Sequence, residues 1–172
     1  NTYNDLGIAF FEIERFDDAM QSYQKTVAIK PDYADAYNNL AVVLDKLGLH
    51  DDALKSFEKA IDLMIKILAI NPDDANTYND LGIAFFEIER FNDAMQSYQK
   101  AVAIKLEFAE AYNNLGTVLQ KLYRFEDAIK SFEKAFTIKP NIDYILGNIL
   151  SNKMNCCNWD DLASLLSDAK QR

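Results

Sequence analysis

The residues of this chain that could do chemistry are few, and their types and spacing favour binding over catalysis. His50 is the single histidine, and Cys156 and Cys157 are adjacent. A zinc site needs about four nitrogen or sulfur ligands, which these three side chains do not supply. They cannot form a catalytic triad, and two cysteines near an apolar stretch are more typical of buried hydrophobic residues than of nucleophiles. We therefore expect no catalytic residue, no metal site and no cofactor.

A more informative pattern is a set of asparagines that recurs along the chain. One series consists of Asn4, Asn38, Asn79 and Asn113, and the residues that follow them form a second series, Asp5, Asn39, Asp80 and Asn114. An asparagine amide both donates and accepts hydrogen bonds, so it can bind a peptide backbone whatever side chains the peptide carries. A row of such amides on one surface is suited to an extended polypeptide. The alternative is that these polar residues only solvate an exposed face.

These residues must be positioned by a repeated element. Residues 76–105 copy residues 1–30 with two differences, where Asp17 becomes Asn92 and Thr26 becomes Ala101. A shorter step of 34 residues, as from Tyr3 to Tyr37, aligns the aromatic and small residues. Four repeats result, at about residues 1–33, 34–74, 75–108 and 109–142, followed by a divergent helical cap at 143–172. Self-similarity at such a period is typical of a solenoid.

Each repeat is expected to be a pair of antiparallel helices, which we call the A helix and the B helix. In the first repeat, residues 2–14 and 17–30 have apolar residues at helical spacing. A mid-helix glycine costs about 1 kcal/mol relative to alanine, so the A-helix glycines need a reason, and close packing against the B helix supplies it. They are Gly7, Gly82 and Gly116.

The ends of the B helices are marked by proline, which cannot continue a helix. Pro31, Pro72 and Pro140 occupy these positions, whereas Leu106 replaces the proline in the third repeat and predicts a more continuous junction there. Pro72 comes seven residues later than the 34-residue step requires. The second B helix is therefore expected to run from about Asp51 to Ile70, with an apolar overhang at residues 64–70.

Helical geometry separates the A-helix residues into two faces. Tyr3, Leu6 and Gly7 share the face expected to pack against the B helix. The opposite face is expected to line a concave groove, and we predict it as the binding site. Its residues are Asn4, Asp5, Ile8, Phe11, Glu12, Asn38, Asn39, Val42, Asn79, Asp80, Ile83, Phe86, Glu87, Asn113, Asn114 and Thr117. We interpret Phe11 and Phe86 as aromatic anchors for a partner on this open face.

The 34-residue pattern resembles the tetratricopeptide repeat, in which aromatic-x2-Leu-Gly is followed by Ala-x3-aromatic and Pro. In the third repeat these positions are Tyr78, Leu81, Gly82, Ala94 and Tyr98. The resemblance implies a right-handed α-solenoid that binds proteins or peptides.

The segment after the repeats, DYILGNILSNKMNCCNWDDL, is similar to the region that follows the repeats in bacterial proteins related to protein O-linked N-acetylglucosamine transferases. The matching residues are Leu146, Gly147, Lys153, Met154, Cys157 and Trp159. In that family a sugar-nucleotide-dependent catalytic domain follows, and a comparable asparagine ladder is known in the repeats.

Composition excludes several classes of function. The net charge of −9 and the pI near 4.6 argue against nucleic acid and anionic membrane surfaces as partners. No apolar run is long enough to span a bilayer, and the two cysteines favour a reducing cytoplasm. Because the chain begins inside a helix at Asn1, we expect it to be part of a longer protein.

We therefore predict an all-α, right-handed solenoid of four helix pairs and a divergent cap. The predicted function is that of a non-catalytic scaffold that binds an extended peptide or partner protein in its groove. Two alternatives stay open. The chain could be the substrate-recognition arm of a larger glycosyltransferase, or it could be a self-assembly module that associates through uncapped ends or the overhang from Met64 to Ile70.

Overall fold

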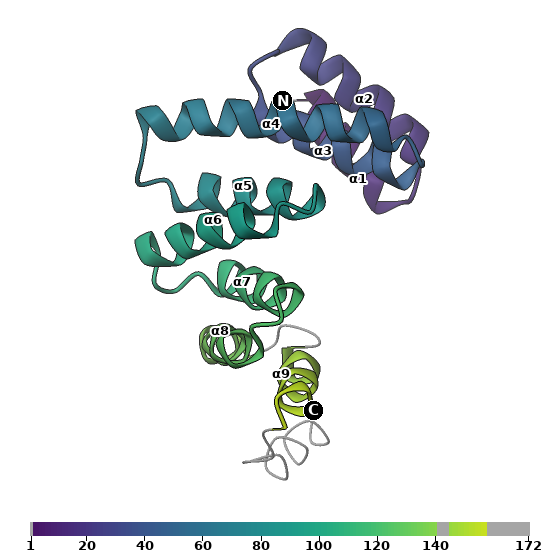
Figure 1. Cartoon of the computed structure of the whole chain (residues 1–172). Coiled ribbons are helices and arrows are strands. Elements are labelled where there is room, and N and C mark those ends of the chain that lie inside the picture. Colours follow the sequence, from purple (N-terminus) through teal and green to yellow (C-terminus); the bar gives the residue numbers. More distant parts are fainter. Residues whose placement is uncertain (1, 141–144, 158–172) are drawn as a thin grey trace. The chain divides into compact units, whose positions relative to one another are not determined.

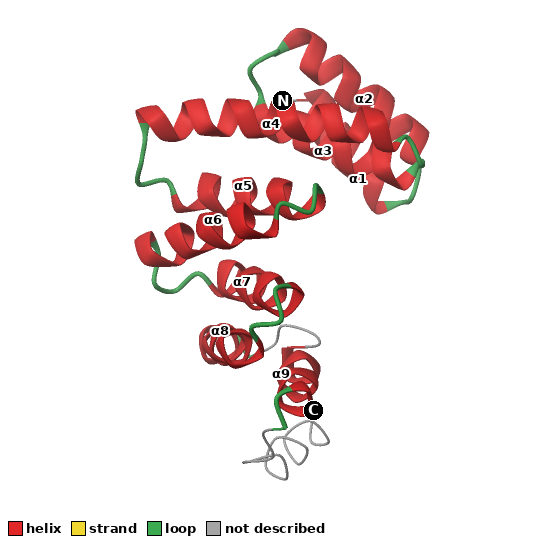
Figure 2. Cartoon of the chain, in the orientation of Figure 1, coloured by secondary structure: helices red, strands yellow, loops and turns green. Residues whose placement is uncertain are grey.

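The computed structural model describes residues 2–140 and 145–157, and every regular element in these ranges is an α-helix (Figure 2). The predicted all-α class is confirmed. The A helices are α1 (Thr2–Glu12), α3 (Ala34–Lys46), α5 (Ala75–Glu87) and α7 (Ala109–Lys121), and the B helices are α2 (Phe16–Ile29), α4 (His50–Ile70), α6 (Phe91–Ile104) and α8 (Phe125–Ile138). Helix α9 (Ile145–Asn155) follows them (Figure 1).

The helices gather into two compact units, which correspond to the 75-residue duplication rather than to the single repeats. The first unit comprises α1 to α4 with residues 87–89, and the second comprises α5 up to Phe86 with α6 to α9. Within the first unit α1 packs on α2, α2 on α3, and α3 on α4. Within the second unit α6 packs on α7, α7 on α8, and α8 on α9. Each unit is described by itself below.

The core of the first unit lies between its two helix pairs. Six buried side chains, Ala19, Tyr23, Leu40, Val43, Leu44 and Ala53, form its centre, and six half-buried ones pack against them, Phe10, Phe11, Phe16, Met20, Val27 and Leu47. Every one of these residues has an identical residue 75 positions later, from Phe85 to Ala128. The two units therefore carry the same core composition.

The A and B helices of a pair approach closely where a glycine faces an aromatic ring. A Cβ atom added to Gly7 would lie 2.5 Å from the Tyr23 ring, one added to Gly82 would lie 2.5 Å from the Tyr98 ring, and one added to Gly116 would lie 2.7 Å from the Phe132 ring. Real Cβ contacts are not this short, so these positions exclude a side chain. The predicted packing role of the glycines is confirmed. In the second pair Ala41 replaces the glycine.

The B helices end where the prolines predict, and the junction without a proline differs from its prediction. Helix α4 ends at Ile70, as predicted from the inserted residues before Pro72. The predicted continuous junction at Leu106 is wrong, because α6 ends at Ile104 and α7 begins at Ala109. The backbone leaves the helix at Lys105 (φ −119°, ψ 93°) much as it does at Lys30 (φ −128°, ψ 86°). The near-identical helix sequence thus ends in the same way without a proline.

The overhang of α4 is less open than its composition suggested. Met64 and Leu68 are buried, whereas Ile65, Ile67 and Ile70 are exposed. After the repeats, α9 from Ile145 to Asn155 lies within the predicted helical cap at 143–172. Residues 143–144 and 158–172 of that cap, Trp159 among them, lie outside the described residues.

Helix α5 begins with a side-chain cap. Asp74 accepts hydrogen bonds through Oδ1 from the backbone N–H groups of Asn76 (3.0 Å) and Thr77 (3.2 Å), and through Oδ2 from the Thr77 hydroxyl (2.8 Å). The hydrogen bond from the Thr77 side chain, helped by the backbone donors, lowers the pKa of Asp74 below its ordinary value of 3.8. A negative charge here also faces the positive end of the helix dipole.

We expect Gly116→Ala to lower the free energy of unfolding by roughly 1–3 kcal/mol, because the added methyl group overlaps the Phe132 ring. The matched change Ala41→Gly should cost only about 0.5–1 kcal/mol, the ordinary helix penalty of glycine. Urea unfolding followed by circular dichroism measures both. A Gly116→Ala variant as stable as the parent would show that the ring can move aside.

We expect Asp74→Ala to lower the free energy of unfolding by about 1 kcal/mol at neutral pH, since it removes the cap of α5. Because the folded-state pKa of Asp74 is depressed, its contribution is fully present above the unfolded pKa and is lost as the pH falls through the folded pKa. The difference from the parent should therefore shrink below about pH 4. The neighbouring exposed Asp73→Ala is the control, and an equal loss in it would contradict the capping role.

Candidate functional site

The predicted groove residues differ widely in how open they are. Asn4 and Asn79 are buried, at 5% and 2% exposure, and four are exposed, Asp5, Ile8, Glu12 and Glu87. The rest are half-buried: Phe11, Asn38, Asn39, Val42, Asp80, Ile83, Phe86, Asn113, Asn114 and Thr117. The expectation that the whole series lies open is therefore wrong at Asn4 and Asn79. At Asn4, helix α3 of the first unit packs alongside α1.

The buried asparagines are held by the asparagine of the next A helix in the same unit. In the first unit Asn39 donates through Nδ2 to Oδ1 of Asn4 at 3.4 Å. In the second unit Asn114 donates in the same way to Asn79 at 3.1 Å. Some of the hydrogen-bonding groups of the asparagine series are thus used inside the chain. These bonds fix the orientation of the Asn39 and Asn114 amides, which are half-buried.

Asn38 and Asn113 have the same place in the sequence pattern as Asn4 and Asn79, but they lie on the second A helix of each unit. Their Oδ1 atoms are buried and have no hydrogen-bond partner among the described residues. Thr117, one turn after Asn113, donates its hydroxyl proton to the Asn113 carbonyl oxygen at 3.1 Å. The two units therefore repeat both the amide pair and the buried, unpaired acceptor.

The aromatic residues of the predicted groove are less open than expected. Phe11 packs against the core of the first unit, and its ring meets that of Phe16 edge to face at 5.5 Å. Phe86 and Phe91 repeat this arrangement at 5.4 Å. An aromatic ring so placed is held by its own unit. The exposed apolar side chain on this surface is instead Ile8, at 41%.

Glu12 is exposed and ends α1 near the buried ring of Tyr23. Burial, followed by the negative charge of Glu12, raises the pKa of the Tyr23 hydroxyl to about 12. The hydroxyl thus stays neutral at physiological pH. Tyr23 is therefore a core residue.

A further polar contact joins α7 to α9 and was missed in the sequence. Asn152, which is fully buried, donates through Nδ2 to Oε1 of Gln120 (3.2 Å) and to the Asn148 carbonyl oxygen (2.7 Å). Gln120 lines a hollow of about 240 Å³ together with Thr117, Lys121 and Tyr123. No sequence signal could have found Asn152, because α9 departs from the 34-residue pattern.

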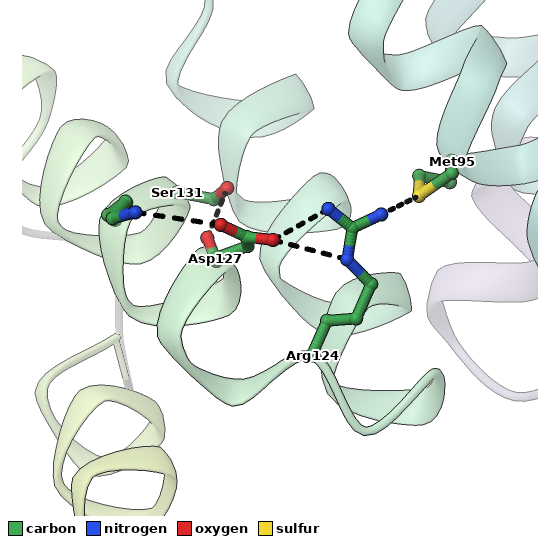
Figure 3. Close-up of polar contacts among 5 residues, drawn as sticks. Met95, Arg124, Asp127 and Ser131 are labelled. Atoms are coloured by element: carbon green, nitrogen blue, oxygen red, sulfur yellow. Dashed lines mark hydrogen bonds and ion pairs between the residues drawn. The ribbon is translucent and has the colours of Figure 1, made fainter. Parts of the chain in front are cut away.

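The turn before α8 is fixed by a charged cluster (Figure 3). Arg124 pairs with Asp127 through Nη2 at 2.6 Å and also donates to the sulfur of Met95 on α6 at 3.4 Å. The hydrogen bond from Arg124 lowers the pKa of Asp127, and Lys130 adds to this effect. Ser131 donates to the Asp127 backbone carbonyl oxygen at 2.9 Å. These contacts hold Arg124 against its own unit.

The described residues contain no group of three His, Cys, Asp or Glu side chains that could hold a metal ion. Over the same ranges, the helices are each too short or too polar to cross a membrane. His50, the single histidine, lies at the start of α4 with its ring exposed and contacts Asp45 at 2.8 Å.

We expect Asn114→Ala to lower the free energy of unfolding by about 1–3 kcal/mol, since it leaves the buried Oδ1 of Asn79 without a donor. Adding Asn79→Ala should recover part of this loss, because the unpaired acceptor is then gone as well. Urea unfolding of both single variants and the double variant gives the coupling energy. The longer Asn39–Asn4 pair of the first unit is the internal control, with a smaller coupling expected. Additive losses would show that the Asn114–Asn79 bond contributes nothing.

Comparison with known proteins places these helix pairs in one family. Models of the tetratricopeptide repeat match residues 7–48, 32–107 and 109–142. No curated protein sequence matches the chain. Among solved structures, a crystal structure of MamA protein is 25% identical, with 99% of this chain and 89% of that chain covered and a TM-score of 0.67.

Two other structures show the same fold at lower identity. PilF of Pseudomonas aeruginosa is 22% identical, covering 95% of this chain and 72% of that one, with a TM-score of 0.74. YrrB, described as a TPR protein with an unusual peptide-binding site, is 18% identical, covering 97% and 82%, with a TM-score of 0.64. The family models together match more than half of the chain, and the helix pairs agree with them. The chain therefore belongs to the tetratricopeptide-repeat proteins.

Proposed function

We propose that the chain is a protein-interaction scaffold that binds an extended peptide, or an extended segment of a partner protein, along the A-helix surface. The observation that carries this proposal is the amide pair that occurs in both units, Asn39 with Asn4 and Asn114 with Asn79. The likeness to a structure described as a peptide-binding TPR protein supports it.

The amide pairs are suited to this task because they are oriented before any ligand binds. Asn39 and Asn114 each use one N–H of the side chain inside the chain, which leaves a second N–H and the oxygen of a half-buried amide. A group already held in place loses less conformational entropy on binding. In each unit the amide would bind the peptide backbone, and an apolar side chain of the same unit, Ile8 in the first or Ile83 in the second, would contact the peptide side chains.

The two alternatives from the sequence stay predictions. The family models end at residue 142, so they do not extend to the segment that resembles the post-repeat region of the glycosyltransferase-related proteins. Self-association through the overhang would rely on Ile65, Ile67 and Ile70, because Met64 is buried. No contact within the described residues favours either alternative over peptide binding.

The proposal is tested by selecting binders to the full chain from a random library of nonapeptides and measuring the affinity of the selected peptides by calorimetry. We expect Ile8→Ser to weaken binding about fivefold, since roughly 1 kcal/mol of apolar contact is lost, and to leave the melting temperature nearly unchanged. Leu54→Ser is the matched control, because Leu54 is similarly exposed at 44% but lies on a B helix.

The control variant should bind the selected peptides as the parent does. If the library gives no binder, the chain is not a peptide-binding scaffold of this kind. If Leu54→Ser weakens binding as much as Ile8→Ser, peptides bind elsewhere than on the A-helix surface.

A further inference from the structure

The B helices begin in two ways. Arginine immediately precedes α2, α6 and α8, whereas Leu49 stands at the equivalent position before α4. Each arginine forms an ion pair with the aspartate three residues after it. Arg15 and Arg90 also lie over a phenylalanine of the preceding A helix, with Cζ 4.7 Å from the centre of the Phe10 ring and 4.5 Å from that of Phe85. These two guanidinium groups therefore have a cation–π partner in their own helix pair.

The phenylalanine is replaced in the helix pair of Arg124, because Leu119 occupies the equivalent position. The Arg124 guanidinium contacts the preceding B helix instead, where Nη1 donates to the sulfur of Met95 at 3.4 Å (Figure 3). Nε and Nη2 both donate to Oδ2 of Asp127, at 3.1 and 2.6 Å. Asp127 thus holds the guanidinium in place with one terminal nitrogen facing a thioether.

A thioether is a weak hydrogen-bond acceptor, and one oxidation step gives it a polar oxygen. A lone pair of the Met95 sulfur attacks one oxygen of hydrogen peroxide and the O–O bond breaks. The departing hydroxide takes the proton of the transferred hydroxyl and leaves as water, so the thioether is oxidised to the sulfoxide and the peroxide is reduced. Met95 is half-buried and the Arg124 side chain is 48% exposed, so peroxide can reach the sulfur from solvent.

We propose that Met95 is a site of oxidation by peroxides, and that Arg124 binds the resulting sulfoxide oxygen. The oxygen forms on an atom that already lies within hydrogen-bond distance of Nη1, and a hydrogen bond from a guanidinium is charge-assisted. Oxidation therefore strengthens the contact between α6 and the turn before α8. Met95 and Arg124 lie outside the A helices, so this site is independent of the proposed peptide-binding surface.

The first unit offers a contrast within the same chain. Met20 corresponds to Met95, is half-buried and packs against the core of the first unit. The residue that corresponds to Arg124 is Leu49, whose side chain has no hydrogen-bond donor. A sulfoxide at Met20 would place a polar oxygen at the edge of a core without a guanidinium to bind it, which is destabilising. The same modification should thus have opposite effects in the two units.

The test uses the full chain carrying Met20→Leu and Met154→Leu, which leaves Met95 and the buried Met64, 2% exposed. The folded chain is treated with hydrogen peroxide, peptide mass spectrometry locates the added oxygen, and circular dichroism gives the melting temperature before and after. We expect oxidation of Met95 to raise the melting temperature by about 2 °C. In the same chain with Arg124→Leu, oxidation should lower it by about 2–4 °C.

A second comparison transfers the arginine to the first unit. In the chain with Met95→Leu and Met154→Leu, oxidation of Met20 should lower the melting temperature by about 2–4 °C. Leu49→Arg should remove most of this loss, because an aspartate again lies three residues later and can hold the guanidinium.

If peroxide leaves Met95 unmodified in the folded chain, the inference is overturned. A melting shift on oxidation that is the same with Arg124 and with Arg124→Leu would also overturn it, since the guanidinium would then not bind the sulfoxide. If the Arg124→Leu variant does not fold, the comparison in the first unit decides. An oxidation loss at Met20 that Leu49→Arg does not reduce would then overturn the inference.

Discussion

The structure depends on the close contact between an A-helix glycine and a B-helix aromatic ring. At Gly7, Gly82 and Gly116 the ring lies so near the helix that a methyl group would overlap it. This contact sets the distance between the two helices of a pair, because protein interiors are close-packed and transmit such spacings to their neighbours. The position of the A-helix surface, and of the amides on it, follows from that spacing.

The second constraint is the need to pair buried polar groups. A row of asparagines between adjacent A helices would be costly if their amides were unpaired. The Asn39–Asn4 and Asn114–Asn79 bonds remove part of that cost and at the same time orient the half-buried member of each pair. The same side chains thus contribute to the stability of the unit and to the proposed binding surface. The buried Oδ1 atoms of Asn38 and Asn113 are the positions in each unit where this pairing is missing among the described residues.

The duplication lets the surfaces of the two units differ while most of the core stays the same. Twelve core positions are identical between them, so the helix pairs can be expected to pack in the same way. Two substitutions, Thr26 to Ala101 and Ala41 to Gly116, lie in the core. Others, such as Asp45 to Gln120, lie at or near the surface, where single changes usually alter stability by less than about 0.5 kcal/mol. The charge of the surface is therefore free to differ between the units.

The sequence by itself determined the helix pairs, the glycine contacts and the end of α4 at Ile70, because these follow from local periodicity and from residues with narrow conformational roles. Only the tertiary structure decided which groove residues are open. Helical periodicity assigns a residue to a face, but it does not show how far the next helix covers that face, and so Asn4, Asn79 and Phe11 were expected to be more exposed than they are. It also could not place Asn152 against Gln120, since α9 follows no repeat and its packing against α7 and α8 arises from contacts distant in the chain.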